Sequence, residues 1–167
     1  MKKRIVLFST LALVLAAVLI WCTLPKETLA SISGGELKMV RISAINPDKR
    51  NPTQQKTLEL TEGELFAQYA DFFYHHAVSP ESVQSMEEMV YTEEALAYDV
   101  GYTFVLEPGE QGIYCVSVDP LGDSGALFHV SYTDLNKPAS LPQRIQLPSG
   151  SLFDSKTIHK YVWEKGK

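Results

Sequence analysis

The chain has 167 residues, of which 45% are hydrophobic, and a formal net charge of −5 at pH 7. Residues 31–167 are long enough to form one domain with its own core. They carry 11 Lys/Arg and 19 Asp/Glu, a net charge of −8. No Lys or Arg lies between Lys56 and Lys137, while 15 Asp/Glu fall in that interval. Such a surface repels nucleic acid and anionic lipid headgroups, so nucleic-acid binding is not expected. The interval is either a solvated acidic surface or a surface that attracts cations, a basic peptide or a basic partner.

The first 30 residues have the pattern of a membrane-targeting leader. Residues 5–24 contain no ionised side chain, and as a helix they would span about 30 Å, the thickness of a bilayer's hydrocarbon core. The basic start, Lys2-Lys3-Arg4, places the N-terminus in the cytoplasm and the body outside. We therefore predict a single-pass membrane anchor, with Ile5, Leu13, Leu19 and Trp21 as anchor residues.

A cleaved signal peptide is the alternative fate of this leader. Thr28-Leu29-Ala30 supplies small residues ahead of Ser31, so cleavage near Ala30 would release a secreted product. The apolar run is longer than that of most signal peptides, which favours the anchor. In either case we expect a leader over 1–30, a Gly-containing linker over 31–36 and one extracytoplasmic domain over 37–167.

The first half of the body predicts two strands and then two helices. The strands are expected at 37–45 and 57–60, with a Pro- and Asn-rich loop over 46–52 between them. A capping box, Thr61-x-x-Glu64, then predicts a helix over about 62–77. Its apolar residues recur every three or four positions and predict a buried aromatic face: Leu65, Tyr69, Phe72, Phe73 and His76. Ser79-Pro80-Glu81 predicts the start of a shorter helix that continues to about residue 90.

The second half predicts a run of strands joined by short turns. Strands are expected at 96–104, 113–118 and 126–132, and the short connections imply an antiparallel meander. Residues 144–147 lie among prolines and could pair only at an edge, and the β-formers of 157–163 favour a strand. Ile158, Tyr161 and Val162 would also fit one helical face. The whole pattern indicates an α+β fold: a mostly antiparallel sheet with one or two amphipathic helices on one face, after the N-terminal transmembrane or signal helix.

One short stretch resembles a catalytic signature. Gly122-Asp123-Ser124-Gly125 resembles the sequence around the nucleophile of chymotrypsin-like serine proteases, and His75 or His76 and then Asp99 precede it in that family's order. The resemblance covers four residues, and the histidines fall in a helical pattern instead of that family's context, so turn chemistry explains the stretch better.

No other pattern indicates a cofactor or metal. There is no phosphate-binding loop, dinucleotide-binding glycine pattern or zinc spacing, and adjacent histidines on a helix point about 100° apart, so His75 and His76 cannot chelate one ion. We predict no catalytic, cofactor or metal residues, and Cys115 as a buried strand residue without a disulfide partner.

A last pattern is shared with a group of exported proteins. Leu24-Pro25-Lys26 at the end of the leader, Tyr102, and Gln111-Gly112-Ile113-Tyr114 resemble small exported proteins of Gram-positive bacteria with a domain of unknown function. The resemblance implies an envelope location. We therefore expect a membrane-tethered binding or accessory domain of the cell envelope, not an enzyme. The alternatives are an immunity- or inhibitor-type protein with an acidic surface for a basic partner, and a small hydrolase.

Overall fold

The computed structural model describes residues 14, 26–46, 54–82, 91–122, 125–148 and 150–167. Seven strands of this part form one sheet in the order β2-β1-β4-β5-β6-β7-β3, and every neighbouring pair is antiparallel. β1 (Glu36–Ile45) pairs with β2 (Gln55–Leu60) and with β4 (Val100–Glu107). β5 (Ile113–Gly122) and β6 (Gly125–Tyr132) complete the predicted meander. β7 (Gln143–Gln146), expected only at an edge, instead lies between β6 and the two-residue β3 (Glu81–Ser82), which forms the far edge. The predicted α+β class with an antiparallel sheet is confirmed.

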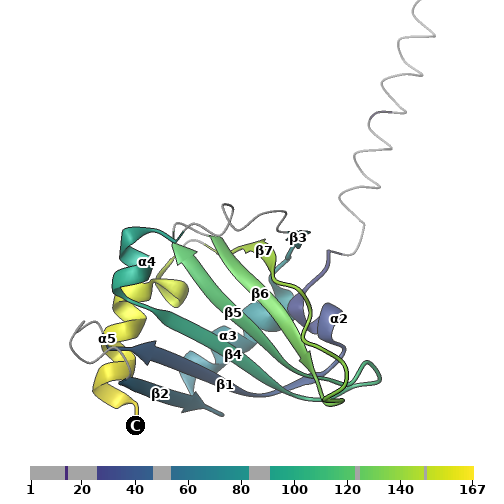
Figure 1. Cartoon of the computed structure of the whole chain (residues 1–167), viewed down its shortest axis with the longest axis horizontal. Coiled ribbons are helices and arrows are strands. Elements are labelled where there is room, and N and C mark those ends of the chain that lie inside the picture. The colour runs from purple at the N-terminus through teal and green to yellow at the C-terminus, as the bar shows by residue number, and fades with distance from the viewer. Residues whose placement is uncertain (1–13, 15–25, 47–53, 83–90, 123–124, 149) are drawn as a thin grey trace, which may run out of the picture.

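The helices lie on one face and at the two ends of this sheet. α3 (Glu64–His75) runs behind the sheet in Figure 1, and α2 (Leu29–Ser33) lies at one end. α4 (Glu93–Ala97) and α5 (Ser155–Lys165) lie at the opposite end, where the chain finishes. A short 3₁₀ helix, η2 (Ser151–Phe153), leads into α5.

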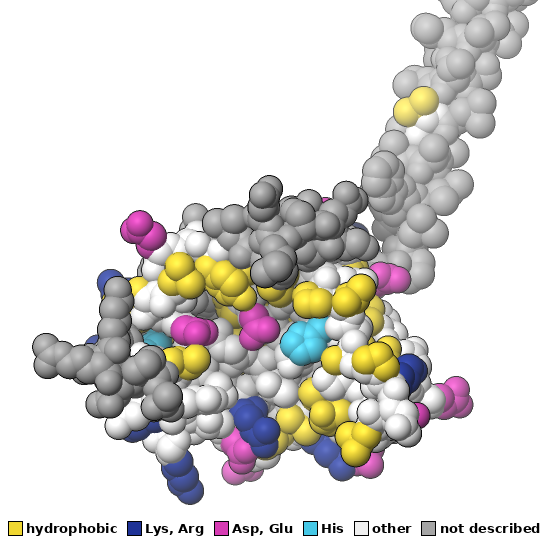
Figure 2. Space-filling view, viewed as in Figure 1, with side chains coloured by type: hydrophobic (Ala, Val, Ile, Leu, Met, Phe, Trp, Pro, Cys, Tyr) yellow, Lys and Arg dark blue, Asp and Glu magenta, His cyan; other side chains and the backbone are white. Residues whose placement is uncertain are grey.

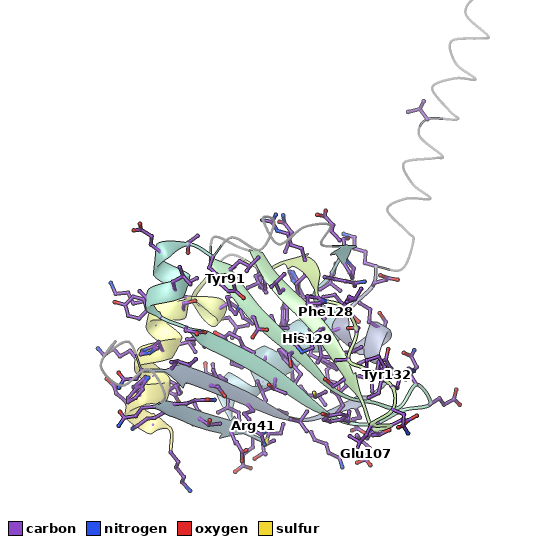
Figure 3. All side chains as sticks on the ribbon, viewed as in Figure 1. Arg41, Tyr91, Glu107, Phe128, His129 and Tyr132 are labelled. Carbon is purple, nitrogen blue, oxygen red and sulfur yellow. The ribbon has the colours of Figure 1, made fainter. Side chains whose placement is uncertain are left out.

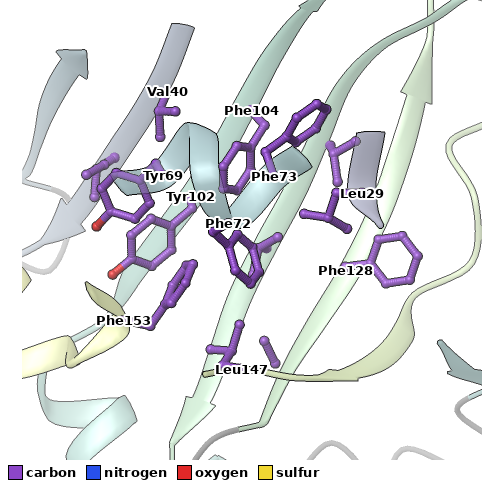
Figure 4. Close-up of a cluster of buried hydrophobic side chains, with 14 of the residues drawn as sticks. Leu29, Val40, Tyr69, Phe72, Phe73, Tyr102, Phe104, Phe128, Leu147 and Phe153 are labelled. Atoms are coloured by element: carbon purple, nitrogen blue, oxygen red, sulfur yellow. The ribbon is translucent and has the colours of Figure 1, made fainter. Parts of the chain in front are cut away.

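An aromatic cluster joins α3 to the middle of the sheet. Strand periodicity puts alternate residues of β4 on the inner face, so Tyr102 and Phe104 are buried while Gly101 and Thr103 are half-buried. The α3 residues Tyr69 and Phe73 pack on them, with ring centroids 5.6 Å apart for Tyr69 and Tyr102 and 5.7 Å apart for Phe73 and Phe104. Figure 4 shows these rings in one layer with Phe72 and Phe153. The predicted burial of Tyr69, Phe72 and Phe73 is therefore confirmed, whereas Leu65 and His76, predicted on the same face, are only half-buried.

The start of α3 differs from the prediction. The expected capping box of Thr61 and Glu64 does not form, because the helix begins at Glu64 with Gly63 as its N-cap and no side-chain cap. Gly63 adopts a φ of 91°, a conformation that glycine reaches without steric cost. The chain therefore enters the helix through a glycine N-cap, without a hydrogen bond from a capping side chain. The helix still carries Glu64 in its first turn, where a negative charge suits the helix dipole.

Three further boundaries also need correction. Residues 157–163, expected as a strand, form most of α5, because the carboxylate of Asp154 caps the helix by accepting a hydrogen bond from the Thr157 N–H at 2.7 Å. The expected helix start at Ser79-Pro80-Glu81 is replaced by β3, and the rest of that helix, 83–90, lies outside the described residues. Leu96, expected on a strand, is on α4 with two thirds of its surface exposed, so the strand begins only at Val100.

Candidate functional site

A groove runs along the exposed side of α3, and we call it the α3 groove. It consists of two hollows, of about 750 and 450 Å³, that share Glu64, Gln68 and Leu152. Both are open to solvent and fall within the size range of ligand sites in proteins. The larger is lined by Glu64, Ala67, Gln68, Asp71, Phe72, His75, His76, Pro148, Gly150 and Leu152. The smaller is lined by Leu60, Glu62, Gly63, Glu64, Leu65, Gln68, Leu152, Thr157, Ile158 and Tyr161.

The first wall of the groove is a polar stripe on α3. Glu64, Gln68, Asp71 and His75 follow one another at four-, three- and four-residue spacing, so they share one helical face, which lies beside the aromatic face in the core. Glu62 adds a third carboxylate just before the helix. Among the described lining residues there is no Lys or Arg, so the groove is acidic along its length.

The second wall comes from residues more than 80 positions away in sequence. The Tyr69 hydroxyl of α3 donates a hydrogen bond of 2.8 Å to the Leu152 carbonyl and so fixes η2 against the helix. Phe72 and Phe153 pack behind this contact with ring centroids 4.7 Å apart. The walls of the groove are therefore tied to each other through the core.

The two histidines of the groove do different things, as expected from their directions on the helix. Nδ1 of His75 lies 3.0 Å from Oδ1 of Asp71, one turn earlier on α3. His76 instead stacks on the ring of Phe72, with centroids 5.0 Å apart and planes 28° from parallel. The described residues contain no group of three or more His, Cys, Asp or Glu side chains placed to hold a metal ion.

The Asp71–His75 pair lies at the solvent-exposed side of the groove. The two side chains are 79% and 75% exposed, so solvent screens the interaction between them. Beside this pair, the groove offers the carboxylates of Glu62 and Glu64 and an apolar floor that includes Phe72 and Leu152.

A second polar region lies on the outer face of the sheet, which is the face turned away from α3. Figure 2 shows carboxylates and a histidine near the middle of this face, and Figure 3 places His129 there on β6. Burial raises the pKa of Asp119 above its ordinary value; nearby Asp99 adds to the rise and His129 opposes it. Burial, and then Asp119 and Asp99, likewise raise the pKa of Tyr91. The carboxylates in this region thus lie close enough to repel each other.

The protease-like stretch has a structural explanation. Gly122 pairs with Gly125 where β5 is followed by β6, and its φ of 105° coincides with a register shift between Pro120 and Gly122, as expected of a glycine at a β-bulge. Asp123 and Ser124 lie outside the described residues. The histidine that the resemblance would require is bonded to Asp71 on α3 instead of to Asp99. Cys115, predicted as a buried strand residue, is 7% exposed on β5 and is a free thiol.

The alternative cleavage site near Ala30 falls within α2. Ile5, Leu13, Leu19 and Trp21 lie outside the described residues. Within the described ranges, no helix is long and apolar enough to cross a membrane. Where a linker was expected over 31–36, the structure has the second half of α2, the Gly34–Gly35 turn and the first residue of β1.

No protein-family model, curated protein or solved structure matches the chain. The α3 groove is a concave site formed by described residues, and its geometry is the basis of the function proposed below. The sequence predictions did not include this groove, although the spacing of Glu64, Gln68, Asp71 and His75 carried its first wall.

Proposed function

We propose that the chain is a membrane-tethered, extracytoplasmic binding domain whose α3 groove holds a basic and partly apolar segment of another protein. The observation that carries this proposal is the stripe of Glu64 and Asp71 beside an apolar floor, in a groove without a described Lys or Arg. Lysine or arginine side chains of a partner would face the stripe, and their apolar neighbours would cover Phe72 and Leu152.

The charge distribution of the chain supports a basic partner. The interval between Lys56 and Lys137 contributes the whole of α3 and no Lys or Arg, so a cationic segment meets no like charge on this helix. Complementary fields of this kind speed association and reject acidic competitors more than they add affinity. An immunity- or inhibitor-type protein is the special case in which the basic partner is itself a toxin or an enzyme.

A peptide-binding measurement tests the proposal directly. The probe is a fluorescent peptide of alternating Lys and Leu, and the control probe replaces each Lys with Glu; both are titrated with the full chain in detergent or nanodiscs. We expect the basic peptide alone to bind, and its Kd to rise as salt increases from low to physiological strength. Binding that is equal for both peptides, or unchanged by salt, would contradict an acidic recognition groove.

Matched variants locate the binding site. Removing two exposed charges with Glu64→Gln and Asp71→Asn should weaken the basic peptide by about 2- to 30-fold, since each exposed pair contributes about 0.2–1 kcal/mol. The control removes two exposed charges outside the groove, Glu36→Gln and Glu110→Gln. Equal weakening by the groove and control variants would show that net charge, not the groove, attracts the peptide.

A further inference from the structure

The short helix α2 is part of the folded domain and not a spacer ahead of it. Leu29 and Ser33 are both 0% exposed, and Leu29 belongs to the main hydrophobic core. Figure 4 shows Leu29 in the same layer of side chains as Phe73 and Phe128. Removal of Leu29 would therefore open a cavity in the core.

Both ends of α2 are fixed by hydrogen bonds. At its start, Thr28 and Ser31 form a reciprocal capping box: the Ser31 N–H donates to the Thr28 hydroxyl at 3.1 Å, and the Thr28 N–H donates to the Ser31 hydroxyl at 2.8 Å. At its end, Gly34 has a φ of 62° and its N–H donates to the Ala30 carbonyl.

The residues on either side of α2 are held by distant parts of the chain. The Glu27 carbonyl accepts a hydrogen bond of 2.8 Å from the N–H of Val78, which follows α3. Gly109, in the β4–β5 turn, approaches Gly34 so closely that a Cβ on Gly109 would lie 1.9 Å from the Gly34 carbonyl oxygen. The fold is thus built around an intact chain from Glu27 to Gly35.

A cut after Ala30 is incompatible with this arrangement. It would divide α2 between its second and third residues and would remove Leu29, the Thr28 cap and the Glu27 carbonyl from the domain. We propose that the chain is not processed there, and that α2 joins the retained apolar leader directly to the domain. This inference rests on the proposed membrane location and is independent of what the α3 groove binds.

The inference places the domain against the membrane without a spacer. Leu24 ends the apolar run, and Glu27, the first of the described residues to form a hydrogen bond with the fold, follows three positions later. Three residues extend over at most about 11 Å. A partner would therefore meet a domain held next to the membrane, instead of one that moves freely on a flexible stalk.

The first test is the mass of the chain made in a bacterium with working export machinery. We expect intact mass and N-terminal sequencing to find residues 5–24 still present, and carbonate washing to leave the protein in the membrane fraction. A mature chain that begins at Ser31 would overturn the structural role of α2. A chain cut anywhere between the apolar run and Thr28 would overturn the anchor.

The second test measures how much the domain depends on α2. Leu29→Ala should lower the Tm of the full chain by about 6 °C or more, because the side chain leaves a cavity in a closed core. Leu135→Ala is the matched control, since Leu135 is 96% exposed, and its Tm should stay within about 2 °C of the parent protein. A Leu29→Ala shift as small as that of the control would contradict the inference.

Discussion

Two buried tyrosines should respond to the same substitution with opposite signs. Tyr102 is 1% exposed, and its hydroxyl makes no well-formed hydrogen bond among the described residues, although it lies within electrostatic reach of the Tyr69 hydroxyl. Tyr69 is 0% exposed, and its hydroxyl donates to the Leu152 carbonyl at 2.8 Å. The rings lie 5.6 Å apart in the same core, so Tyr102→Phe and Tyr69→Phe each remove one oxygen from nearly the same surroundings.

The expected magnitudes follow from whether the hydroxyl is paired. A buried hydroxyl without a partner costs about 1–3 kcal/mol of desolvation, so Tyr102→Phe should stabilise the domain by up to that amount. Tyr69→Phe removes a hydrogen bond and leaves the Leu152 carbonyl without its partner, so it should destabilise the domain by about 1–3 kcal/mol. The two variants should therefore differ by at least about 1 kcal/mol.

Urea unfolding of the full chain can resolve a difference of this size. The midpoint should rise for Tyr102→Phe and fall for Tyr69→Phe, with the same dependence on urea as the parent protein, since neither change alters the surface exposed on unfolding. If Tyr102→Phe is the less stable of the two, its hydroxyl has a partner in the folded protein and the reasoning is refuted. A parallel loss of peptide binding in Tyr69→Phe would show that the Tyr69–Leu152 bond also holds the α3 groove in shape.

Two pH-dependent predictions follow from shifted pKa values. Burial raises the pKa of both Tyr69 and Tyr102 above the ordinary value of 10.0, so the unfolded chain loses these protons at a lower pH than the folded chain. The free energy of unfolding should therefore fall as the pH rises above about 10, by up to about 1.4 kcal/mol per pH unit for each tyrosine. Unfolding midpoints at pH 9 and 10.5 measure this fall; an equal fall in the Tyr69→Phe variant would contradict the assignment. Burial also raises the pKa of Asp119, whose protonated form stabilises the fold below the ordinary value of 3.8, and this contribution is lost as the pH rises through the raised pKa. Asp119→Asn should therefore raise the Tm at pH 7 and leave it nearly unchanged at pH 3. The exposed control Glu110→Gln should leave the Tm unchanged at both pH values. A lower Tm for Asp119→Asn at pH 7 would show that a partner stabilises the carboxylate.

Periodicity predicted the elements whose own residues determine their burial. The three- and four-residue spacing of Tyr69, Phe72 and Phe73 was enough to predict α3, and the alternation around Tyr102 and Phe104 was enough to predict the inner face of β4. Short turns between strands likewise predicted the antiparallel meander. In each case the signal is local, because one helix or strand presents its apolar residues to a single neighbouring layer.

The errors occurred where a tertiary contact or a cap outweighed local preference. Residues 157–163 are rich in β-formers, yet the Asp154 cap and the burial of Ile158 and Val162 on one side make them a helix. The Thr61 hydroxyl was available to cap α3, but Gly63 ends the preceding turn in a conformation that starts the helix later. β-propensity and capping motifs are weak preferences, and packing decides between two structures that differ by about 1 kcal/mol.

The α3 groove shows why half of a site can be visible in a sequence and the other half hidden. Its first wall follows from helical periodicity. The spacing of Glu64, Gln68, Asp71 and His75 places these side chains on one face of α3, outside the aromatic face that packs in the core. Its second wall depends on η2 returning to α3 across more than 80 residues, and the contact that fixes this return is a hydroxyl–carbonyl bond between Tyr69 and Leu152. A main-chain carbonyl leaves no trace in the sequence, so no spacing could have indicated that acceptor. The acidic stripe alone predicts only a solvated helix surface; it becomes a candidate binding site because the core brings an apolar wall alongside it.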